Sequence, residues 1–293
     1  MFKGIMPAIF SIYNENMDVI NDTVEKLVNY HLNNGMSGFY VGGNTGECTV
    51  LPNKTRKQML DAVVAANKKR GTIIAHVGAG HLVDVYELID HANTLEIDAI
   101  ASLPPSLQSY YNMEEIIEYY RMIANRSKHP VFAYVTSVLQ DDIIKFAEEL
   151  SKIDNIIGLK ISVPNYYLFG NIKKRFEKRF IIFNGPDETM ICGLSEGADG
   201  AIGTSYNIFP KLALSIYDNF QKGKNDEALK AQRRLNDFID ILLDENIAWW
   251  KATLSILLGF DVGYTVAPQK MPNTNDLRVL KEKLEALNCQ EIL

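Results

Sequence analysis

The sequence predicts an α/β protein in which eight parallel strands close into a (β/α)8 TIM barrel, followed by a C-terminal helical extension. Short apolar runs alternate with longer amphipathic segments, and the alternation repeats about every thirty residues, the size of a βα unit. Such strand, helix, strand connections pair in parallel through right-handed crossovers. The turn after the first run, at residues 11–14, lacks the glycine fingerprint of a doubly wound dinucleotide-binding sheet, so a closed barrel is favoured.

The individual elements follow from the runs and their periodicity. Strands are expected at 4–10, 38–41, 72–77, 99–103, 131–134, 156–161, 180–183 and 200–202. Helices are expected between them at 19–32, 54–68, 84–92, 113–124 and 141–150, and after them at 210–221, 225–243, 247–258 and 276–287. We expect residues 1–208 to form the barrel that carries the active site and residues 209–293 a helical region packed on it, because no Pro/Gly/Ser-rich linker separates them.

The composition argues against several classes of partner. A net charge of -6 gives no electrostatic reason to expect nucleic acid or an anionic membrane. The sequence has no run of about 18 apolar residues, and residues 1–18 lack the long apolar region of a signal peptide. Cys48, Cys192 and Cys289 suggest neither a disulfide framework nor a zinc site, and the histidines show no metal-ligand spacing. We therefore expect a cytoplasmic protein.

Residues 156–161 place a lysine inside a run that is otherwise typical of a buried strand. Side chains two apart share a face of a strand, so Lys160 and Ser162 point one way and Leu159 the other. Near the C-terminal end of a barrel strand, the inward face is where reactive residues lie. Burial favours the neutral amine, the form that attacks a carbonyl, so Lys160 is a candidate Schiff-base nucleophile. The alternative is a lysine that reaches the barrel mouth and pairs with a carboxylate.

Two further segments lie at neighbouring strand ends. The fifth strand ends at Tyr134, where a phenol could carry protons between a carbinolamine, an imine and a substrate hydroxyl. The turn GGNTGE, residues 42–47, combines glycines that let backbone N–H groups approach an anion with side-chain donors from Asn44 and Thr45. Taken singly, Tyr134 is more typical of an aromatic residue packed in the core, and the turn is more typical of a simple glycine-rich connection. Together with Lys160 they form a stronger signal, in which the lysine attacks a carbonyl and the turn holds a carboxylate.

Several motifs in register, YVGGNTGE, IIAHVGAG, GLK, FNGPDE and GADGAIGTSYNI, resemble the pyruvate-dependent class I aldolases, which include N-acetylneuraminate lyase and dihydrodipicolinate synthase. The resemblance runs from Gly4 to about Leu287. It implies a barrel with a C-terminal helical region, a homotetramer, and no metal or organic cofactor. The implied ligands are pyruvate and an amino sugar or sugar acid.

The resemblance also implies a role for each matching residue. Lys160 would form the imine with pyruvate, and Tyr134 would carry the proton. Thr45 would connect to the tyrosine hydroxyl, and Ser162 would occupy a nearby catalytic hydroxyl position. Asn44 and Thr45 would bind the pyruvate carboxylate. The residues implied to hold the hydroxyl chain of a sugar are Gly185, Asp187, Glu188 and Thr204.

A neighbouring aromatic and the acceptor substrate complete the resemblance. Tyr110 or Tyr111 resembles the aromatic that reaches a neighbouring subunit's site in relatives, and the sequence does not choose between them. Leu139 stands where dihydrodipicolinate synthases carry an arginine that binds the second substrate's carboxylate. The bidentate contact between an arginine and that carboxylate is therefore missing here. The motifs FNGPDE and GAIGTSYN instead resemble the sialic acid lyases, which implies reversible cleavage of N-acetylneuraminate to N-acetylmannosamine and pyruvate.

Four alternatives stay open at this point. Two lie within the family: an aldolase for another 2-keto-3-deoxy sugar acid and an enzyme like dihydrodipicolinate synthase. A phosphate-handling barrel isomerase would use Gly185, Gly200 and Gly203 as its phosphate cradle. A non-catalytic barrel that binds a metabolite would keep the pocket and tolerate removal of Lys160.

Overall fold

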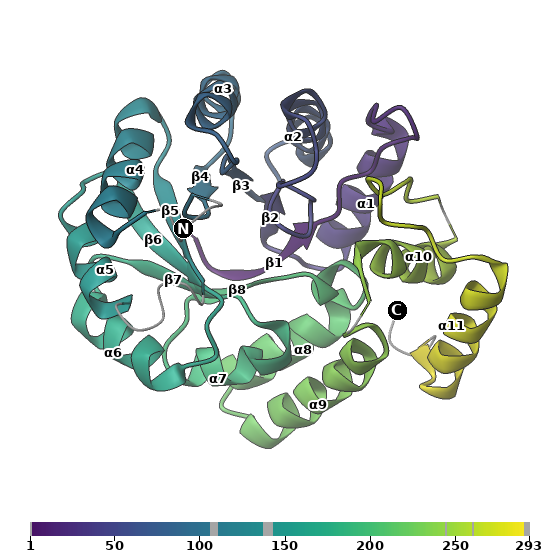
Figure 1. The fold of residues 1–293 in the computed structure, drawn as a ribbon. Helices are drawn as coiled ribbons and strands as arrows, with labels where there is room; N and C mark the ends of the chain where they lie inside the picture. The colour runs from purple at the N-terminus through teal and green to yellow at the C-terminus, as the bar shows by residue number, and fades with distance from the viewer. Residues whose placement is uncertain (1, 106–110, 137–142, 244, 260, 290–293) are drawn as a thin grey trace.

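The computed structural model describes residues 2–105, 111–136, 143–243, 245–259 and 261–289, and their strands form a closed barrel (Figure 1). The strands are β1 (Gly4–Ile9), β2 (Gly38–Val41), β3 (Thr72–His76), β4 (Ala99–Ser102), β5 (Val131–Val135), β6 (Ile156–Ile161), β7 (Ile181–Asn184) and β8 (Gly200–Gly203). They pair in parallel in the order of the sequence, and β8 pairs with β1. The predicted (β/α)8 barrel is confirmed, and no strand end differs from its expected position by more than one residue.

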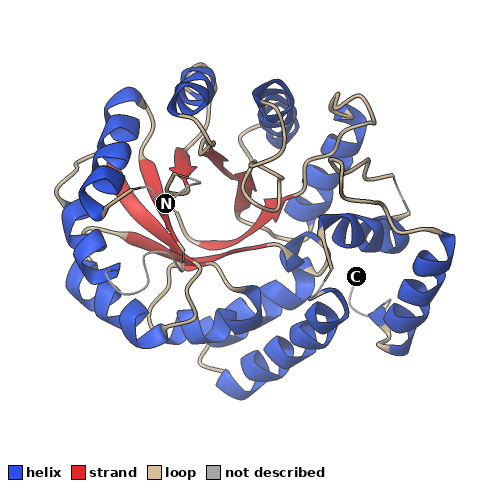
Figure 2. Cartoon of the chain, viewed as in Figure 1, coloured by secondary structure: helices blue, strands red, loops and turns tan. Residues whose placement is uncertain are grey.

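A helix follows each strand and covers the outside of the barrel, as Figure 2 shows in blue around the red strands. These helices are α1 (Asn21–Asn33), α2 (Asn53–Asn67), α3 (Leu82–Ala92), α4 (Met113–Arg126), α5 (Ile143–Ser151), α6 (Tyr166–Phe176), α7 (Met190–Ser195) and α8 (Pro210–Gln221). Apolar periodicity does not single out α6 or α7. Gly170, a poor helix former, lies in the middle of α6, and α7 is only 6 residues long.

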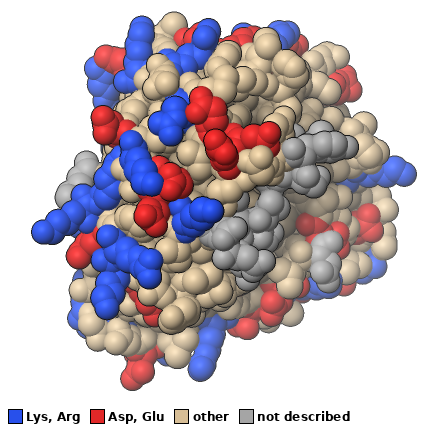
Figure 3. All heavy atoms as spheres, turned by 60° about the vertical axis from the view of Figure 1, so that its left-hand side comes forward, with Lys and Arg blue, Asp and Glu red and all other residues tan. Residues whose placement is uncertain are grey.

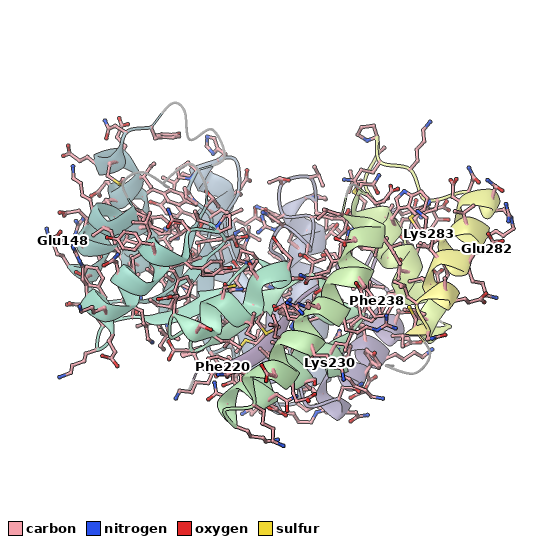
Figure 4. All side chains as sticks on the ribbon, turned by 90° about the horizontal axis from the view of Figure 1, so that it is seen from below. Glu148, Phe220, Lys230, Phe238, Glu282 and Lys283 are labelled. Atoms are coloured by element: carbon pink, nitrogen blue, oxygen red, sulfur yellow. The ribbon has the colours of Figure 1, made fainter. Side chains whose placement is uncertain are left out.

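Three more helices form the predicted C-terminal extension: α9 (Asn225–Leu242), α10 (Ile247–Leu258) and α11 (Thr274–Ala286). The extension is joined to the barrel through α8, which contacts both β1 and α9. Phe209, just before α8, stacks on Phe238 of α9 with ring centroids 4.5 Å apart. Figure 4 shows α9, with Phe238 labelled, between the barrel and α11. The domain boundary after residue 208 stays a prediction.

Two apolar layers result from the alternation of side chains along the strands. The inward residues form one cluster inside the barrel: Met6, Ala8, Tyr40, Ile74, Ala99, Ala101, Phe132, Phe183 and Ile202. Outward residues, such as Leu159 and Ile161 of β6, pack with the helices in a second, larger cluster. Because side chains fill the barrel, a ligand site is expected at the ends of the strands and in the loops beyond them.

The surface is charged without a single dominant sign on the face that Figure 3 shows, where Lys and Arg are interspersed with Asp and Glu. Elsewhere in the described structure, charged side chains form surface ion pairs, such as Arg126 with Asp90 and Lys57 with Glu87, which contribute little to stability. Among the helices in the described ranges, none combines the length and the apolarity needed to cross a membrane.

Candidate active site

Lys160 and Tyr134 lie side by side near the carboxyl end of the barrel. The register of β5 and β6 sets Tyr134 directly opposite Lys160. The Lys160 Nζ atom lies 4.3 Å from the centre of the Tyr134 ring and 4.8 Å from that of Tyr40 on β2. Lys160 is only 6% exposed, and its outward neighbour Leu159 packs beneath the helices. The expected inward orientation of Lys160 is confirmed.

The surroundings of Lys160 are aromatic. Within the part of the chain that the structure describes, its Nζ atom has no ion pair, and its close contacts are the Tyr40 and Tyr134 rings. A second buried lysine, Lys251, is different, because its Nζ atom lies 2.7 Å from a Glu47 oxygen. The faces of aromatic rings attract an ammonium group without pairing it with a carboxylate. This argues against the alternative in which Lys160 pairs with a carboxylate at the barrel mouth.

A hydroxyl pair lies next to the lysine. The Ser162 hydroxyl donates a hydrogen bond to the Tyr134 oxygen at 3.1 Å, which leaves the proton of the phenol free to point elsewhere. Ser162 has room because Gly185 has no side chain: a Cβ atom there would overlap the Ser162 Oγ atom and lie 2.9 Å from the Ile161 carbonyl oxygen. A tyrosine that can give a proton and receive one from a neighbouring serine is suited to proton transfer.

The GGNTGE turn follows β2 and shapes one side of the barrel mouth. Gly42 has φ +72°, a conformation that glycine adopts at no steric cost, and a Cβ atom at Gly46 would lie 2.9 Å from the Gly42 Cα atom. The Glu47 N–H closes the turn by donating to the Asn44 carbonyl at 2.9 Å. The turn leaves Asn44 exposed and Thr45 buried. Its backbone and these two side chains offer several donors to an anion.

The Thr45 hydroxyl has a different partner from the one that the family resemblance implies. Its Oγ1 atom lies 2.6 Å from the Thr204 Oγ1 atom, just before the short helix η4 (Ser205–Asn207). Among the hydrogen bonds of the described residues, Thr45 is joined to Thr204, and the Tyr134 oxygen accepts from Ser162. A hydroxyl can donate one hydrogen bond and accept others, so the connection from Thr45 to Tyr134 stays a prediction.

Asp187 and Glu188 begin the short helix η3 (Asp187–Thr189) after β7. The Asp187 carboxylate is buried and accepts a hydrogen bond from the Ser205 N–H at 2.6 Å. Burial raises the pKa of Asp187 to about 6, and the Ser205 N–H and the Lys160 ammonium lower it only in part. Glu188 is exposed. The two adjacent carboxylates therefore present one desolvated and one solvated acceptor.

An open cleft of about 370 Å³ collects these side chains. It is lined from the barrel by Asn44, Thr45, Gly185, Pro186, Asp187, Glu188 and Thr204, and from the extension by Ile239, Leu243, Glu245, Ile247 and Trp250. All the residues predicted from the sequence to bind the keto acid carboxylate and the sugar hydroxyls therefore share one cleft. Lys160 and Tyr134 do not line it, but Tyr134 is bonded to Ser162, which packs against Gly185 of the cleft wall.

Sequence reasoning missed two aromatic residues of this region. Trp250, on a helix of the C-terminal extension, lines the cleft. Nothing in the sequence identifies the helix that faces the barrel mouth, so no local signal was available. Tyr40 could have been found, because it lies inward on β2, two residues before the turn. It is buried, and its hydroxyl has no hydrogen-bond partner in the described structure.

The remaining candidates lie elsewhere. Tyr110 lies outside the described residues. Tyr111 is 46% exposed and lines a separate apolar hollow of about 230 Å³ beside α3 and α4. Its role at a neighbouring subunit's site stays a prediction. Considering only the residues that the structure describes, no group of three or more His, Cys, Asp or Glu side chains is arranged to hold a metal ion.

Comparisons with known proteins identify the family of this chain. The model of the Dihydrodipicolinate synthetase family matches residues 1–287. An N-acetylneuraminate lyase of Mediterraneibacter gnavus is 30% identical, covering 98% of this chain and 92% of its own. The wild-type sialic acid aldolase of Ruminococcus gnavus has a TM-score of 0.91 at 30% identity, covering 100% of this chain and 99% of that one. A catalytic lysine mutant of the sialic acid aldolase of Ruminococcus gnavus has a TM-score of 0.92 at 30% identity, covering 100% and 98%. The closed barrel, its helical extension and the family match over nearly the whole length together show that this chain belongs to the dihydrodipicolinate synthetase family.

Proposed function

We propose that this chain is a class I aldolase that cleaves N-acetylneuraminate reversibly to N-acetylmannosamine and pyruvate through an imine on Lys160. The observation that carries the proposal is the buried Lys160 Nζ atom, 4.3 Å from the Tyr134 ring and without an ion pair in the described ranges. Family membership supports aldolase chemistry, and the N-acetylneuraminate lyase of Mediterraneibacter gnavus supports the choice of substrate. The Ruminococcus gnavus relative works with a catalytic lysine, and Lys160 is the candidate for that role here.

The first step is formation of the imine. The neutral Lys160 amine attacks the C2 carbonyl of the keto acid, and the resulting carbinolamine loses water to give the C=N bond. Asn44 and Thr45, with the backbone of their turn, hold the carboxylate and so orient the carbonyl toward the lysine. Tyr134 supplies the proton that allows the hydroxyl group of the carbinolamine to leave as water. The Tyr134 oxygen is then a base, stabilised by the hydrogen bond from Ser162.

The second step is cleavage of the carbon–carbon bond. The Tyr134 oxygen takes the proton of the substrate's C4 hydroxyl, the C3–C4 bond breaks, and its electron pair moves through C2 to the imine nitrogen. The sugar leaves as an aldehyde, and an enamine stays on Lys160. Protonation of the enamine at C3 and hydrolysis of the imine then release pyruvate and restore the lysine. Each proton moved in this scheme passes through a residue at the ends of β5 and β6 or through water.

The hydroxyl chain of the sugar would lie in the open cleft. Asp187 and Glu188 are strong acceptors for hydroxyl groups, and Thr204 both donates and accepts. The cleft volume of about 370 Å³ is within the range of small-molecule sites. The wall from α9 and α10 adds apolar surface opposite these polar groups, which suits a molecule with one polar and one carbon-rich side.

The phosphate-handling alternative is disfavoured by what occupies the space beside its three glycines. The room next to Gly185 is taken by Ser162, and the room next to Gly203 by the Asp187 carboxylate, which would repel a phosphate. Gly200 packs against the Gly4 backbone at the beginning of β1 and β8, the opposite end of the barrel. The alternatives within the family, a 2-keto-3-deoxy sugar acid aldolase or an enzyme like dihydrodipicolinate synthase, are decided by the substrate assay below.

The test is intact mass spectrometry after incubation with pyruvate and borohydride. We expect wild type to gain one reduced pyruvate adduct and Lys160→Ala to gain none and to lose lyase activity on N-acetylneuraminate. Lys173→Ala, which removes a partly buried lysine of α6 that pairs with Asp199 at the amino ends of the strands, is the control and should be labelled like wild type. An unlabelled wild type would contradict aldolase chemistry and favour the non-catalytic barrel. If wild type is labelled but leaves N-acetylneuraminate intact, the substrate is another keto acid.

We also propose that the protein is a cytoplasmic homotetramer. The family resemblance supports the tetramer, and the free, largely buried Cys48 and Cys289 are compatible with a reducing compartment. Light scattering coupled to size exclusion should give four times the mass of the chain. A monomer at micromolar concentration would contradict the tetramer without affecting the adduct test.

A further inference from the structure

We propose that Tyr13, Glu47 and Lys251 form a buried lock by which the C-terminal extension positions the carboxylate-binding turn. The three residues come from distant parts of the chain: the loop after β1, the end of the GGNTGE turn, and α10. The inference rests on the proposed function, because it assumes that Asn44 and Thr45 hold the keto acid carboxylate. It adds positioning residues that touch neither the substrate nor Lys160.

The contacts of the lock satisfy both oxygens of one carboxylate. The Lys251 Nζ atom lies 2.7 Å from Glu47 Oε1, with side chains only 0% and 3% exposed. The Tyr13 hydroxyl donates to Glu47 Oε2 at 2.6 Å. The Lys251 ammonium also donates to the Tyr264 carbonyl and lies 4.3 Å above the Tyr13 ring. Glu47 is therefore held from two sides, by the loop that leaves β1 and by the extension.

The backbone conformation of Glu47 connects these side-chain contacts to the shape of the turn. Glu47 has φ 61°, in the left-handed region that residues with a Cβ atom rarely adopt. Such a conformation persists only where surrounding contacts hold it, and it is commonest at functional sites. In this conformation the Glu47 N–H reaches the Asn44 carbonyl and closes the turn around Thr45. Holding the Glu47 side chain therefore holds the shape of the turn.

The charge of the lock argues for positioning over stability. Burying an ion pair removes both groups from water, and apolar residues of similar volume usually stabilise a fold as well or better. A fold that needed only packing at this place would have no use for the pair. The pair does provide direction, because a carboxylate whose two oxygens both accept from fixed donors, here Lys251, Tyr13 and more weakly the Val266 N–H, can lie in only one place. The preceding residue on α10, Trp250, already lines the cleft on the sugar side. One helix thus supports the site at both the carboxylate end and the sugar end.

Three changes separate positioning from stability. Tyr13→Phe removes one donor and leaves the ion pair. Lys251→Met removes the ammonium and leaves Glu47 buried without its countercharge. The double variant Glu47→Gln with Lys251→Met removes both charges together. The control is Lys173→Met, which breaks a pair of the same 2.7 Å length with Asp199, the residue before β8 at the opposite end of the barrel.

The measurement is the pyruvate concentration that gives half of the maximal borohydride-trapped adduct, taken with the maximal yield and the melting temperature. We expect Tyr13→Phe and the double variant to raise that concentration by about tenfold or more, because small displacements of a binding group cost one to two orders of magnitude. The maximal yield at saturating pyruvate should match wild type. The double variant should melt at a higher temperature than Lys251→Met without recovering the wild-type half-saturation. Lys173→Met should keep the wild-type half-saturation.

Three outcomes would overturn the lock. Folded Tyr13→Phe and double variants with wild-type half-saturation would show that the turn does not depend on it. An equal rise in Lys173→Met would make the effect a general loss of stability. A wild-type half-saturating pyruvate concentration in the double variant alone would mean that Glu47 and Lys251 only neutralise each other's charge and do not position the turn. Failure of the proposed function looks different, because wild type itself would then form no adduct.

Discussion

At the scale of single residues, the site depends on how differently neighbouring polar groups are solvated. Asp187 and Glu188 are adjacent in the sequence, but Asp187 is buried against Ser205 and Glu188 is exposed. Burial disfavours a charged carboxylate, and it raises the pKa of Asp187 to about 6. Asp187 is therefore the acceptor whose charge changes just below neutral pH.

This difference predicts a pH dependence of sugar binding. Above about pH 6 Asp187 is a carboxylate that accepts strongly from hydroxyl groups, and below it a neutral acid that accepts weakly. We expect the KM for N-acetylneuraminate to rise several-fold as the pH falls from 7 to 5. Steady-state kinetics at half-unit intervals would measure it. Asp187→Asn should remove the step near pH 6, and Glu188→Gln should retain it. A step that survives Asp187→Asn would assign it to another group.

At the scale of elements, the alternation of side chains along the strands predicted most about the site. A period of two placed Lys160 inward and Leu159 outward, and the register of β5 and β6 then brought Tyr134 beside the lysine. Helices with regular apolar spacing were equally predictable. Periodicity does not predict which elements from other parts of the chain pack against a given βα unit. The contribution of α10 to the cleft, through Ile247 and Trp250, is of that kind.

The position of α10 predicts different effects for two adjacent tryptophans. Both tryptophans pack against the large apolar cluster, but Trp250 also lines the cleft and Trp249 does not. We expect Trp250→Ala to lower kcat/KM for N-acetylneuraminate by about tenfold, because it removes apolar contact with the sugar side of the substrate. Half-saturation of the pyruvate adduct should stay at the wild-type value. The matched control, Trp249→Ala, should lower the melting temperature and leave kcat/KM near wild type. Equal kinetic losses in both variants would contradict the assignment of Trp250 to the cleft.

At the scale of the whole molecule, closure of the barrel makes distant residues neighbours. Glu47 and Lys251 are 204 positions apart, and Thr45 and Thr204 are 159 apart, yet each pair is in contact. The barrel itself could be predicted, because each βα unit is local and the units repeat. Contacts across the closed barrel and to the extension could not, since they depend on how the units pack once the chain has folded. This is why the lysine and the turn were found from the sequence and the lock was not.

The same packing buries groups that cannot take up a proton, and this predicts a loss of stability in acid. His31 of α1 is fully buried between the Tyr30 and Phe39 rings, and burial lowers its pKa from 6.5 to about 3. Between these values the unfolded chain binds a proton that the folded chain does not, so stability falls as the pH falls, by about 1.4 kcal/mol per pH unit for this group. Urea unfolding at pH 7 and pH 5 should therefore show His31→Leu losing about 2 kcal/mol less than wild type over that interval. An identical loss in both proteins would mean that His31 becomes protonated within the fold.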